Sequence, residues 1–300
     1  MAADDAYAKL STEGVLAKAR NLDVLSSERI VSLLVDEERN SAGAVRRAKV
    51  RIAAAADVVA DALRAGGRLV YVGAGTSGRL AALDAAECPP TFGTRSSRVV
   101  AIVAGGTRAL SRSVEGAEDD SEDARAQIRK RRVDAKDVVI AISASGVTPF
   151  ALAALDEARR RGARTVFVTC TNVTPKCAQI VIGLEVGAEV LAGSTRLKAG
   201  TATKLCLNAI STCAMVRLGK CYGPRMVDVV ASNAKLRSRA RRMVIALTGT
   251  SPSSADTLLK LAGGHVKIAV VMSRLDITRR DAERLLTAAG GQLRALLGAP

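Results

Sequence analysis

The chain is poor in aromatic residues: only 2% of its 300 residues are Phe, Trp or Tyr, and Trp is absent. Its core must therefore be built from Ala, Val, Leu and Ile. With 48% hydrophobic residues, the chain can bury one large core or two smaller ones. No aromatic residues stand within the basic clusters, where a nucleic-acid-binding protein would use them to stack on bases.

Metal-ligating and disulfide patterns are also missing. The chain has one histidine, His265, and its cysteines form no C-x-x-C pair. The spacing of the last three cysteines could suggest a metal site, but the histidine lies far from them in sequence. We therefore expect no metal, and buried free thiols in a cytosolic protein, at Cys88, Cys170, Cys177, Cys206, Cys213 and Cys221.

No apolar run approaches the ~20 residues that a membrane-spanning helix needs, and the N-terminus lacks the pattern of a signal peptide. The net charge of +16 could indicate nucleic acid as a partner. However, the sharpest basic clusters, 129–132, 159–161 and 239–242, stand near the ends of predicted helices or in linkers. Basic side chains are favourable at helix C-termini. We expect a cytoplasmic protein with a basic, solvated surface, and neither a membrane nor a nucleic acid as its partner.

The strongest local pattern is a glycine turn at Gly73, Gly75 and Gly78. It follows an apolar run over 69–72, which predicts a buried parallel strand, and it precedes helix formers over 80–86. Glycines let the backbone approach a ligand closely, and a helix N-terminus presents unpaired N–H groups to an anion. The turn therefore predicts a phosphate site.

The spacing G-x-G-x-x-G also occurs in dinucleotide-binding folds, which need an acidic residue near the end of the second strand to hold a ribose. Here the second predicted strand, 99–103, is followed by Ala104-Gly105-Gly106-Thr107, with no acid. The turn carries the hydroxyl groups of Thr76 and Ser77 instead, which suit the oxygens of a phosphate monoester. A dinucleotide site is the weaker interpretation.

Strands and helices alternate along the middle of the chain. This predicts an α/β fold, with a parallel sheet, helices on both faces and ligands at the carboxyl ends of the strands. The part before about residue 64 is predicted to be helical, and the C-terminal part to be a small three-helix bundle. The predicted strands are 69–72, 99–103, 138–142, 165–169 and 180–186, and the predicted helices include 45–63, 80–86, 109–117 continuing toward 128, 150–161, 240–247, 255–262, 266–272 and 278–289.

A second hydroxyl-rich loop follows the third predicted strand. Ser143, Ser145, Gly146 and Thr148 precede Pro149, a residue favoured in the first turn of a helix. These side chains either cap that helix or bind an anion at its N-terminus. Because two such loops converge on one edge of the sheet, a phosphosugar pocket is the better interpretation.

A long helix is predicted from about residue 194 to 219, with Ser194 or Thr195 as its cap. Lys198 lies in its opening turns. The ammonium of Lys198 could reach an anionic ligand or remain in solvent, and the spacing alone favours neither.

Two glutamates stand near the same predicted edge. Glu87 lies at the C-terminus of the first helix after the turn, where the helix dipole disfavours a negative charge. Such a placement marks a candidate functional residue, although a buried salt bridge would also explain it. Glu115 follows the second strand and precedes a glycine. Two carboxyl groups there would suit acid–base chemistry on a sugar.

Seven motifs resemble those of one family. They are GAGTSGRL (73–80), DAAECPPTF (84–92), EGAED (115–119), GSTRLKAG (193–200), LGK (218–220), MVDV (226–229) and SNAKL (232–236). From about Thr12 to its C-terminus the chain resembles the N-acetylmuramic acid 6-phosphate etherases, which have the sugar-isomerase (SIS) fold and are related to the longer glucokinase regulatory protein. This implies a three-layer α/β/α sandwich, a homodimer and a C-terminal helical domain similar to a ubiquitin-associated (UBA) fold, with domains at 1–55, 56–236 and 237–300.

The resemblance implies cleavage of the D-lactyl ether of N-acetylmuramate 6-phosphate to N-acetylglucosamine 6-phosphate and D-lactate, without a metal or organic cofactor. Loss of the C2 proton expels lactate by β-elimination, and water then adds. Glu87 would protonate the lactate oxygen, for which it needs partial desolvation, and Glu115 would be the second catalytic carboxylate. The substrate would be bound by Gly75, Thr76, Ser77, Gly78, Ser143, Ser145, Gly146, Thr148, Ser194 and Lys198.

The chain departs from the family pattern at several positions, among them Val15, Val35 and Val147. Val15 and Val147 stand where the family usually has Arg, and Val35 stands where it usually has Asn. These changes concern substrate affinity or identity more than chemistry, because both glutamates and both loops are kept. Three alternatives are a non-catalytic sugar-phosphate sensor, a phosphosugar isomerase of the same fold, and a DNA-binding regulator. The N-terminal helices lack the helix-turn-helix pattern that the last would need.

Overall fold

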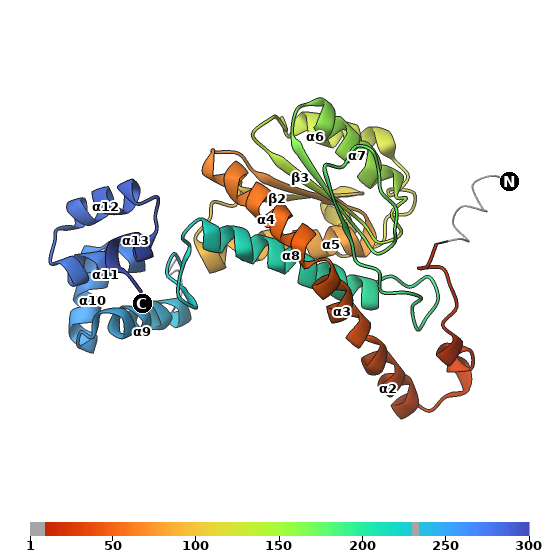
Figure 1. Cartoon of the computed structure of the whole chain (residues 1–300), viewed down its shortest axis with the longest axis horizontal. Coiled ribbons are helices and arrows are strands. Elements are labelled where there is room, and N and C mark those ends of the chain that lie inside the picture. Colours follow the sequence, from red (N-terminus) through yellow and green to blue (C-terminus); the bar gives the residue numbers. More distant parts are fainter. Residues whose placement is uncertain (1–9, 230–233, 300) are drawn as a thin grey trace. The chain divides into compact units, whose positions relative to one another are not determined.

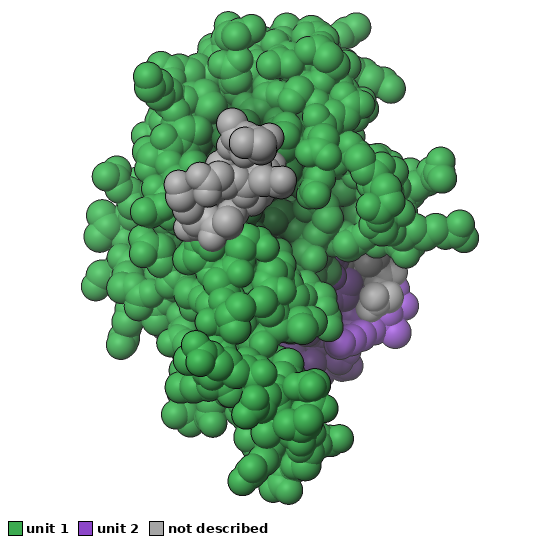
Figure 2. Space-filling model, turned by 90° about the vertical axis from the view of Figure 1, so that its right-hand side faces the viewer, with its two compact units in different colours: residues 1–86, 97–211 green, residues 87–96, 212–300 purple. Residues whose placement is uncertain are grey.

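The computed structural model describes residues 10–229 and 234–299, so the motif residues Ser232 and Asn233 lie outside the described part. The chain divides into two compact units, distinguished by colour in Figure 2. The first unit comprises residues 1–86 and 97–211, and the second comprises residues 87–96 and 212–300. Each unit has a hydrophobic core of its own. The domain bounds expected from the sequence stay a prediction.

Five parallel strands form the sheet of the first unit, in the order β2-β1-β3-β4-β5. Every residue of β1 and β3 is buried, as expected for continuous apolar runs in the centre of a parallel sheet. The predicted strands are confirmed, but the last one ends at Gly183 rather than 186, because the chain leaves the sheet there. The strands are β1 (Leu69–Gly73), β2 (Val99–Val103), β3 (Val138–Ser143), β4 (Arg164–Thr169) and β5 (Ile180–Gly183).

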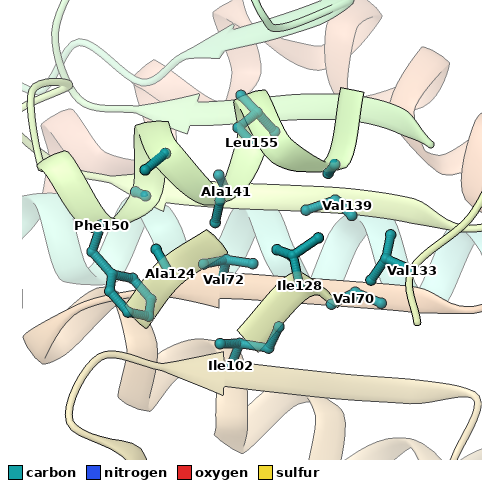
Figure 3. Packing of buried hydrophobic residues seen from close by; sticks show 14 of the residues in the cluster. Val70, Val72, Ile102, Ala124, Ile128, Val133, Val139, Ala141, Phe150 and Leu155 are labelled. Carbon is teal, nitrogen blue, oxygen red and sulfur yellow. The ribbon is translucent and has the colours of Figure 1, made fainter. Parts of the chain in front are cut away.

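Helices cover both faces of this sheet (Figure 1), which confirms the predicted three-layer α/β/α sandwich. α7 (Pro149–Arg160) packs on β1, β3 and β4 and against α6 (Ser121–Lys130), whereas α4 (Lys49–Arg64) packs on the opposite face. Figure 3 shows the core between the sheet and the α6–α7 layer, where Phe150 and Ile128 lie close to the strands. The core is built almost entirely from aliphatic side chains, as the composition requires.

The prediction of a helix over 109–117 is wrong. Its first residues belong to a short 3-10 helix, η3 (Gly106–Leu110), and a loop follows. Gly116 has φ +72°, a left-handed conformation that interrupts a helix. α6 begins only after Asp120, whose side chain accepts the N–H of Asp123 as a helix cap.

Two other helices have different bounds from those predicted. α5 (Gly75–Phe92) is longer than the predicted 80–86, because the glycine turn already forms its first turn and two prolines are accommodated near its end. The helix predicted over 45–63 is interrupted at Ala48, which separates α3 (Arg39–Arg47) from α4.

The N-terminal part is less helical than expected. Residues 10–26 form turns and two 3-10 helices, η1 (Ala17–Ala19) and η2 (Leu22–Val24). The first α-helix of the described part is α2 (Ser27–Glu37), which Ser26 caps by accepting the N–H of Arg29.

The second unit is mainly helical. Its three predicted short helices, α10–α12, are confirmed, and α9 and α13 pack with them around a core of aliphatic residues. Its resemblance to a UBA fold stays a prediction. Among the helices in the described ranges, none has both the length and the apolar character needed to cross a membrane. Its elements are β6 (Cys221–Tyr222), β7 (Arg225–Met226), α9 (Ala234–Thr248), α10 (Pro252–Leu261), α11 (Val266–Leu275), α12 (Arg279–Ala288) and α13 (Leu293–Leu297).

Candidate active site

The strand order reverses between β1 and β3, since β2 lies on one side of β1 and the later strands lie on the other. Ligands of open α/β sheets bind at the carboxyl ends of the strands at such a reversal. The glycine turn follows β1, and the hydroxyl-rich loop follows β3. The two loops predicted to form the site are therefore neighbours at this edge.

The glycine turn is tight at its base and open at its tip. A Cβ on Gly78 would lie 2.6 Å from the carbonyl oxygen of Gly73 and 2.8 Å from Cγ1 of Val103, so no side chain fits there. Gly75 begins α5 with φ +51°, and no atom lies within 4 Å of the position of its missing Cβ. The backbone can thus approach a ligand at Gly75 while the base of the turn is fixed.

Thr76 and Ser77 form the first turn of α5 and are half-buried. Neither hydroxyl makes a hydrogen bond to another residue in the described part of the chain. The first N–H groups of a helix have no partner within it, so two hydroxyls and several N–H groups are available to one anion. The long helix α8 (Lys198–Arg217) borders this turn: a Cβ on Gly200 would lie 3.7 Å from Cγ2 of Thr76.

In the second loop, Ser143 organises the backbone. Its buried Oγ accepts the N–H groups of Gly146 at 3.0 Å and Thr148 at 3.3 Å, and it lies 2.8 Å from Oγ1 of Thr148. Ser145 is half-buried, and its Oγ makes two long contacts. It accepts the N–H of Val147 at 3.4 Å and lies 3.4 Å from the Oγ of Ser143. Ser145 is therefore better placed than Ser143 to turn its hydroxyl toward a ligand.

Thr171 holds this loop through a hydrogen bond to its backbone. It is not among the site residues predicted from the sequence. Its Oγ1 donates to the carbonyl oxygen of Ser145 at 3.0 Å and lies 3.0 Å from Oγ1 of Thr169. Gly146, at φ +85°, sits directly on it, because a Cβ there would lie 2.8 Å from Oγ1 of Thr171. Thr169 and Thr171 are hydroxyl residues at the end of a predicted strand, so the criterion that selected Ser143 could have found them.

Lys198 is not on the surface. Its side chain is 2% exposed, and its Nζ lies 2.9 Å from Oε2 of Glu37, which comes from α2. This ion pair lowers the pKa of the Glu37 carboxyl, against the opposing effect of burial. The Oγ of Ser41 also donates to the carbonyl oxygen of Lys198, at 3.1 Å. Lys198 would have to leave Glu37 before its ammonium could contact a ligand.

The cap of α8 differs from the prediction of Ser194 or Thr195. The helix begins at Lys198, and Glu189 accepts the N–H groups of Lys198 at 3.1 Å and of Ala199 at 2.9 Å. Glu189 is completely buried, and burial raises the pKa of its carboxyl despite these hydrogen bonds. No local spacing reveals it, because it caps a helix that begins nine residues later. Ser194 is half-buried in the turn before the helix.

Glu115 is exposed, in the loop between η3 and α6. The guanidinium of Arg79 holds this loop to the first turns of α5 by donating to the carbonyl oxygen of Ala109 at 2.9 Å. At the other end of the loop, the N–H of Phe150 donates to the carbonyl oxygen of Glu118 at 2.9 Å. The loop that carries Glu115 is thereby attached to α5 and α7, the helices that follow the two ligand loops.

Glu87 is also exposed, so the partial desolvation expected for it is not present in the single chain. The buried carboxylate of α5 is Asp84, three residues earlier, whose pKa is raised by burial. It accepts hydrogen bonds from Tyr71 at 2.8 Å, Asn208 at 2.7 Å and Ser211 at 3.0 Å. Asp84 therefore attaches α5 to β1 and α8.

Known proteins resemble this chain over nearly its whole length. Residues 51–159 match the family model of the glucokinase regulatory protein N-terminal SIS domain. An N-acetylmuramic acid 6-phosphate etherase of Trichormus variabilis is 52% identical over 95% of this chain and 94% of its own. One of Mycolicibacterium smegmatis is 45% identical over 97% of this chain and 98% of its own. A solved phosphoheptose isomerase of Francisella tularensis, 17% identical, covers 63% of this chain and 98% of its own with a TM-score of 0.47.

Proposed function

The chain belongs to the N-acetylmuramic acid 6-phosphate etherase family, and we propose how its own residues carry out the reaction of that family. It is an enzyme of cell-wall amino sugar recycling, an etherase. In the proposed reaction the D-lactyl ether of N-acetylmuramate 6-phosphate is cleaved to N-acetylglucosamine 6-phosphate and D-lactate.

The observation that supports the proposed site most is the meeting of two hydroxyl-bearing loops at the β1–β3 reversal. In the proposal, the phosphate accepts the N–H groups of residues 75–77 and the hydroxyl hydrogens of Thr76 and Ser77. Gly78, whose own N–H donates to the carbonyl oxygen of Ala74 at 3.1 Å, keeps the turn tight beneath the phosphate. Ser145 donates from the second loop, which Ser143, Gly146 and Thr148 keep in shape. Ser194 borders the sugar, and Lys198 acts by fixing the first turn of α8 beside Thr76.

The chemistry is assigned to the two glutamates. Glu115 takes the C2 proton of the open-chain sugar, the C2–C3 double bond forms, and the C3–O bond breaks. Glu87 gives its proton to the departing lactate oxygen, and water then adds across the double bond to restore a C3 hydroxyl. The net reaction converts the ether and one water molecule into the C3 alcohol of the sugar and D-lactate. Carboxyl groups can perform every proton transfer that these steps need.

We further propose a homodimer and a cytoplasmic location. A carboxyl that acts as a general acid near neutral pH needs shielding from water, and the exposed Glu87 lacks it in the single chain. A second subunit would supply that shielding. The six cysteines are all reduced thiols, which suits a reducing compartment.

The decisive experiment incubates the enzyme with N-acetylmuramate 6-phosphate in ¹⁸O-labelled water and measures both products by mass spectrometry. We expect one D-lactate per sugar, with the label in the sugar and none in lactate, because the C3–O bond breaks. Label in lactate would contradict β-elimination. Phosphosugar binding without lactate, or aldose–ketose conversion, would instead favour a sensor or an isomerase.

The two carboxyl roles can be separated with Glu87→Gln and Glu115→Gln in deuterated water. Glu87→Gln should lower lactate release about 10²- to 10⁴-fold while exchange of the C2 proton continues, because only the acid is lost. Glu115→Gln should abolish both. Glu118→Gln, in the same exposed loop, is the matched control and should keep the wild-type rate. Near-normal lactate release by Glu87→Gln would refute its assignment.

A further inference from the structure

The loop that carries Glu115 needs attachments outside itself to hold the carboxylate in place. Residues 111–120 lie between η3 and α6, and apart from Val114 and Ala117 they are exposed. The carboxylate of Glu115 accepts a hydrogen bond from Oγ of Ser113 at 2.9 Å. Because Ser113 belongs to the same loop, this bond does not fix the carboxylate relative to the sheet. The position of the carboxylate depends on where the loop itself is held.

Arg79 holds the side of the loop that precedes the glutamate. Its guanidinium donates through Nε to the carbonyl oxygen of Ala109 at 2.9 Å and through Nη2 to that of Arg112 at 3.1 Å. The rigid fork of a guanidinium fixes two acceptors at once, which a single ammonium cannot do. The loop also packs on the end of β2, since a Cβ on Gly105 would lie 2.9 Å from Cβ of Val114.

The other side of the loop is held by α7. The N–H of Phe150, the second residue of that helix, donates to the carbonyl oxygen of Glu118 at 2.9 Å. Phe150 comes two residues after Thr148 of the hydroxyl-rich loop, and Arg79 comes two residues after Ser77 of the glycine turn. Each attachment of the loop therefore belongs to a helix that begins at one of the two ligand loops.

We propose that Arg79 is a positioning residue that couples the bound phosphate to the carboxylate of Glu115. The inference rests on the function proposed above and gives the phosphate a role beyond affinity. A phosphate on the N–H groups of residues 75–77 orders the first turn of α5, and the fork of Arg79 passes that order to the backbone of the loop. Binding energy from a group that takes no part in the chemistry is thus used to place the base beside the C2 proton, which raises kcat.

The bonds of Arg79 distinguish a fork from a charge. Both go to backbone carbonyl oxygens, and no carboxylate among the described residues pairs with the guanidinium. Lysine at this position would keep the positive charge near the phosphate but could not hold two carbonyl groups in one plane. Arg79→Lys therefore removes the coupling and leaves the charge.

The test measures D-lactate release from N-acetylmuramate 6-phosphate and exchange of its C2 proton in deuterated water. In Arg79→Lys both kcat values should fall about a hundredfold, because the base is misplaced. Inhibition by inorganic phosphate should be as strong as in wild type or stronger, because phosphate no longer has to order the loop. Loss of both reactions distinguishes Arg79→Lys from Glu87→Gln, which should keep the exchange.

Arg108→Lys is the matched control. Arg108 is an exposed residue of η3 next to Ala109, and its side chain makes no hydrogen bond or ion pair with another described residue. The control should keep the wild-type rates, and circular dichroism should show both variants folded. Wild-type kcat in Arg79→Lys would overturn the inference. Weaker phosphate inhibition with an unchanged kcat would also overturn it, because Arg79 would then serve phosphate binding alone.

A second measurement needs no folded variant. The wild-type enzyme is given N-acetylmuramate, which lacks the phosphate, with and without inorganic phosphite, a small dianion that can occupy the glycine turn. Phosphite should raise the rate of C2 exchange about tenfold or more at saturating sugar, since the turn is then ordered as by the natural substrate. Arg79→Lys should lose this activation. No activation of wild type would mean that the phosphate supplies affinity only.

Failure of the coupling can be told from failure of the proposed function. If wild type releases D-lactate from the phosphosugar and Arg79→Lys matches it, the coupling is wrong and the etherase assignment stands. If wild type binds the phosphosugar but neither exchanges its C2 proton nor releases lactate, both proposals fall.

Discussion

At the residue scale, the shape of the glycine turn depends on the absence of a side chain at Gly78. The carbonyl group of Gly73 and the side chain of Val103 meet at Gly78, which leaves no volume for even a methyl group. The atoms that a Cβ would strike are mostly backbone, and these cannot move without displacing β1 or α5. The position of Thr76 and Ser77 relative to the sheet is therefore set by a missing side chain.

We predict that Gly78→Ala reduces kcat/KM at least about a hundredfold, since a misplacement of about 1 Å at a binding group can cost that much. It should also lower the urea midpoint of unfolding, because the added methyl overpacks a buried site. Gly43→Ala is the control. In the middle of α3 its Cβ would meet only the far end of Arg47, at 3.5 Å. Unchanged kinetics in Gly78→Ala would mean that the turn does not position the substrate.

The ammonium of Lys198 is buried in an ion pair, which its place in the sequence does not reveal. Its position in the first turn of α8 permits either a ligand contact or a solvated side chain. The structure shows neither, because a carboxylate 161 positions earlier in the chain neutralises it in the interior. Such a partner is invisible to any local reading of the sequence.

At the element scale, the start of α8 is held by two carboxylates with opposite pKa shifts. Burial raises the pKa of Glu189, which caps the helix, and the ammonium of Lys198 lowers that of Glu37. A group with a raised pKa binds protons more tightly in the folded state, so its contribution to stability falls as the pH rises above its ordinary value. A lowered pKa has the opposite effect.

We predict from this that Glu189→Gln and Glu37→Gln change stability with opposite pH trends. The advantage of wild type over Glu37→Gln should be complete well above the ordinary pKa of 4.5 and should disappear as the pH falls below it. The advantage over Glu189→Gln should shrink as the pH rises through and above 4.5. Near pH 5, Glu189→Gln should still cost about 1–3 kcal/mol, because one buried N–H of α8 loses its acceptor.

Urea unfolding at several pH values, followed by circular dichroism, measures both trends. Glu185→Gln is a suitable control, since Glu185 is exposed and its carboxylate has no partner within the described residues. Its backbone oxygen accepts a hydrogen bond from Arg47. Parallel pH profiles for the two variants would contradict the assigned causes.

At the scale of the whole molecule, the two units each contain three cysteines. Cys170, Cys177 and Cys206 lie in the first unit, and Cys88, Cys213 and Cys221 lie in the second. All six are buried or half-buried. Burial raises the pKa of the Cys170 thiol to about 12 and also raises those of Cys177, Cys206 and Cys221.

We predict that the native protein reacts with Ellman's reagent about a hundredfold more slowly than the unfolded protein, because the thiolate is the reactive form. All six thiols should be titrated in denaturant, with no increase after treatment with a reductant. Mass spectrometry of partially labelled protein would show which unit opens first. Rapid reaction of all six native thiols would contradict their burial.

The sheet, the glycine turn, the loop after β3 and the family could all be predicted from the sequence, because each depends on a run of neighbouring residues. Short apolar runs that alternate with helix formers favour the buried strands of a parallel sheet, and seven motifs in one order are specific. The sequence could not show that Lys198 pairs with Glu37, that Glu189 caps α8 or that Glu87 and Glu115 are exposed in the single chain; the folded structure shows all three. These depend on which distant residues fold against one another, and burial, ion pairing and capping between distant segments leave no local pattern.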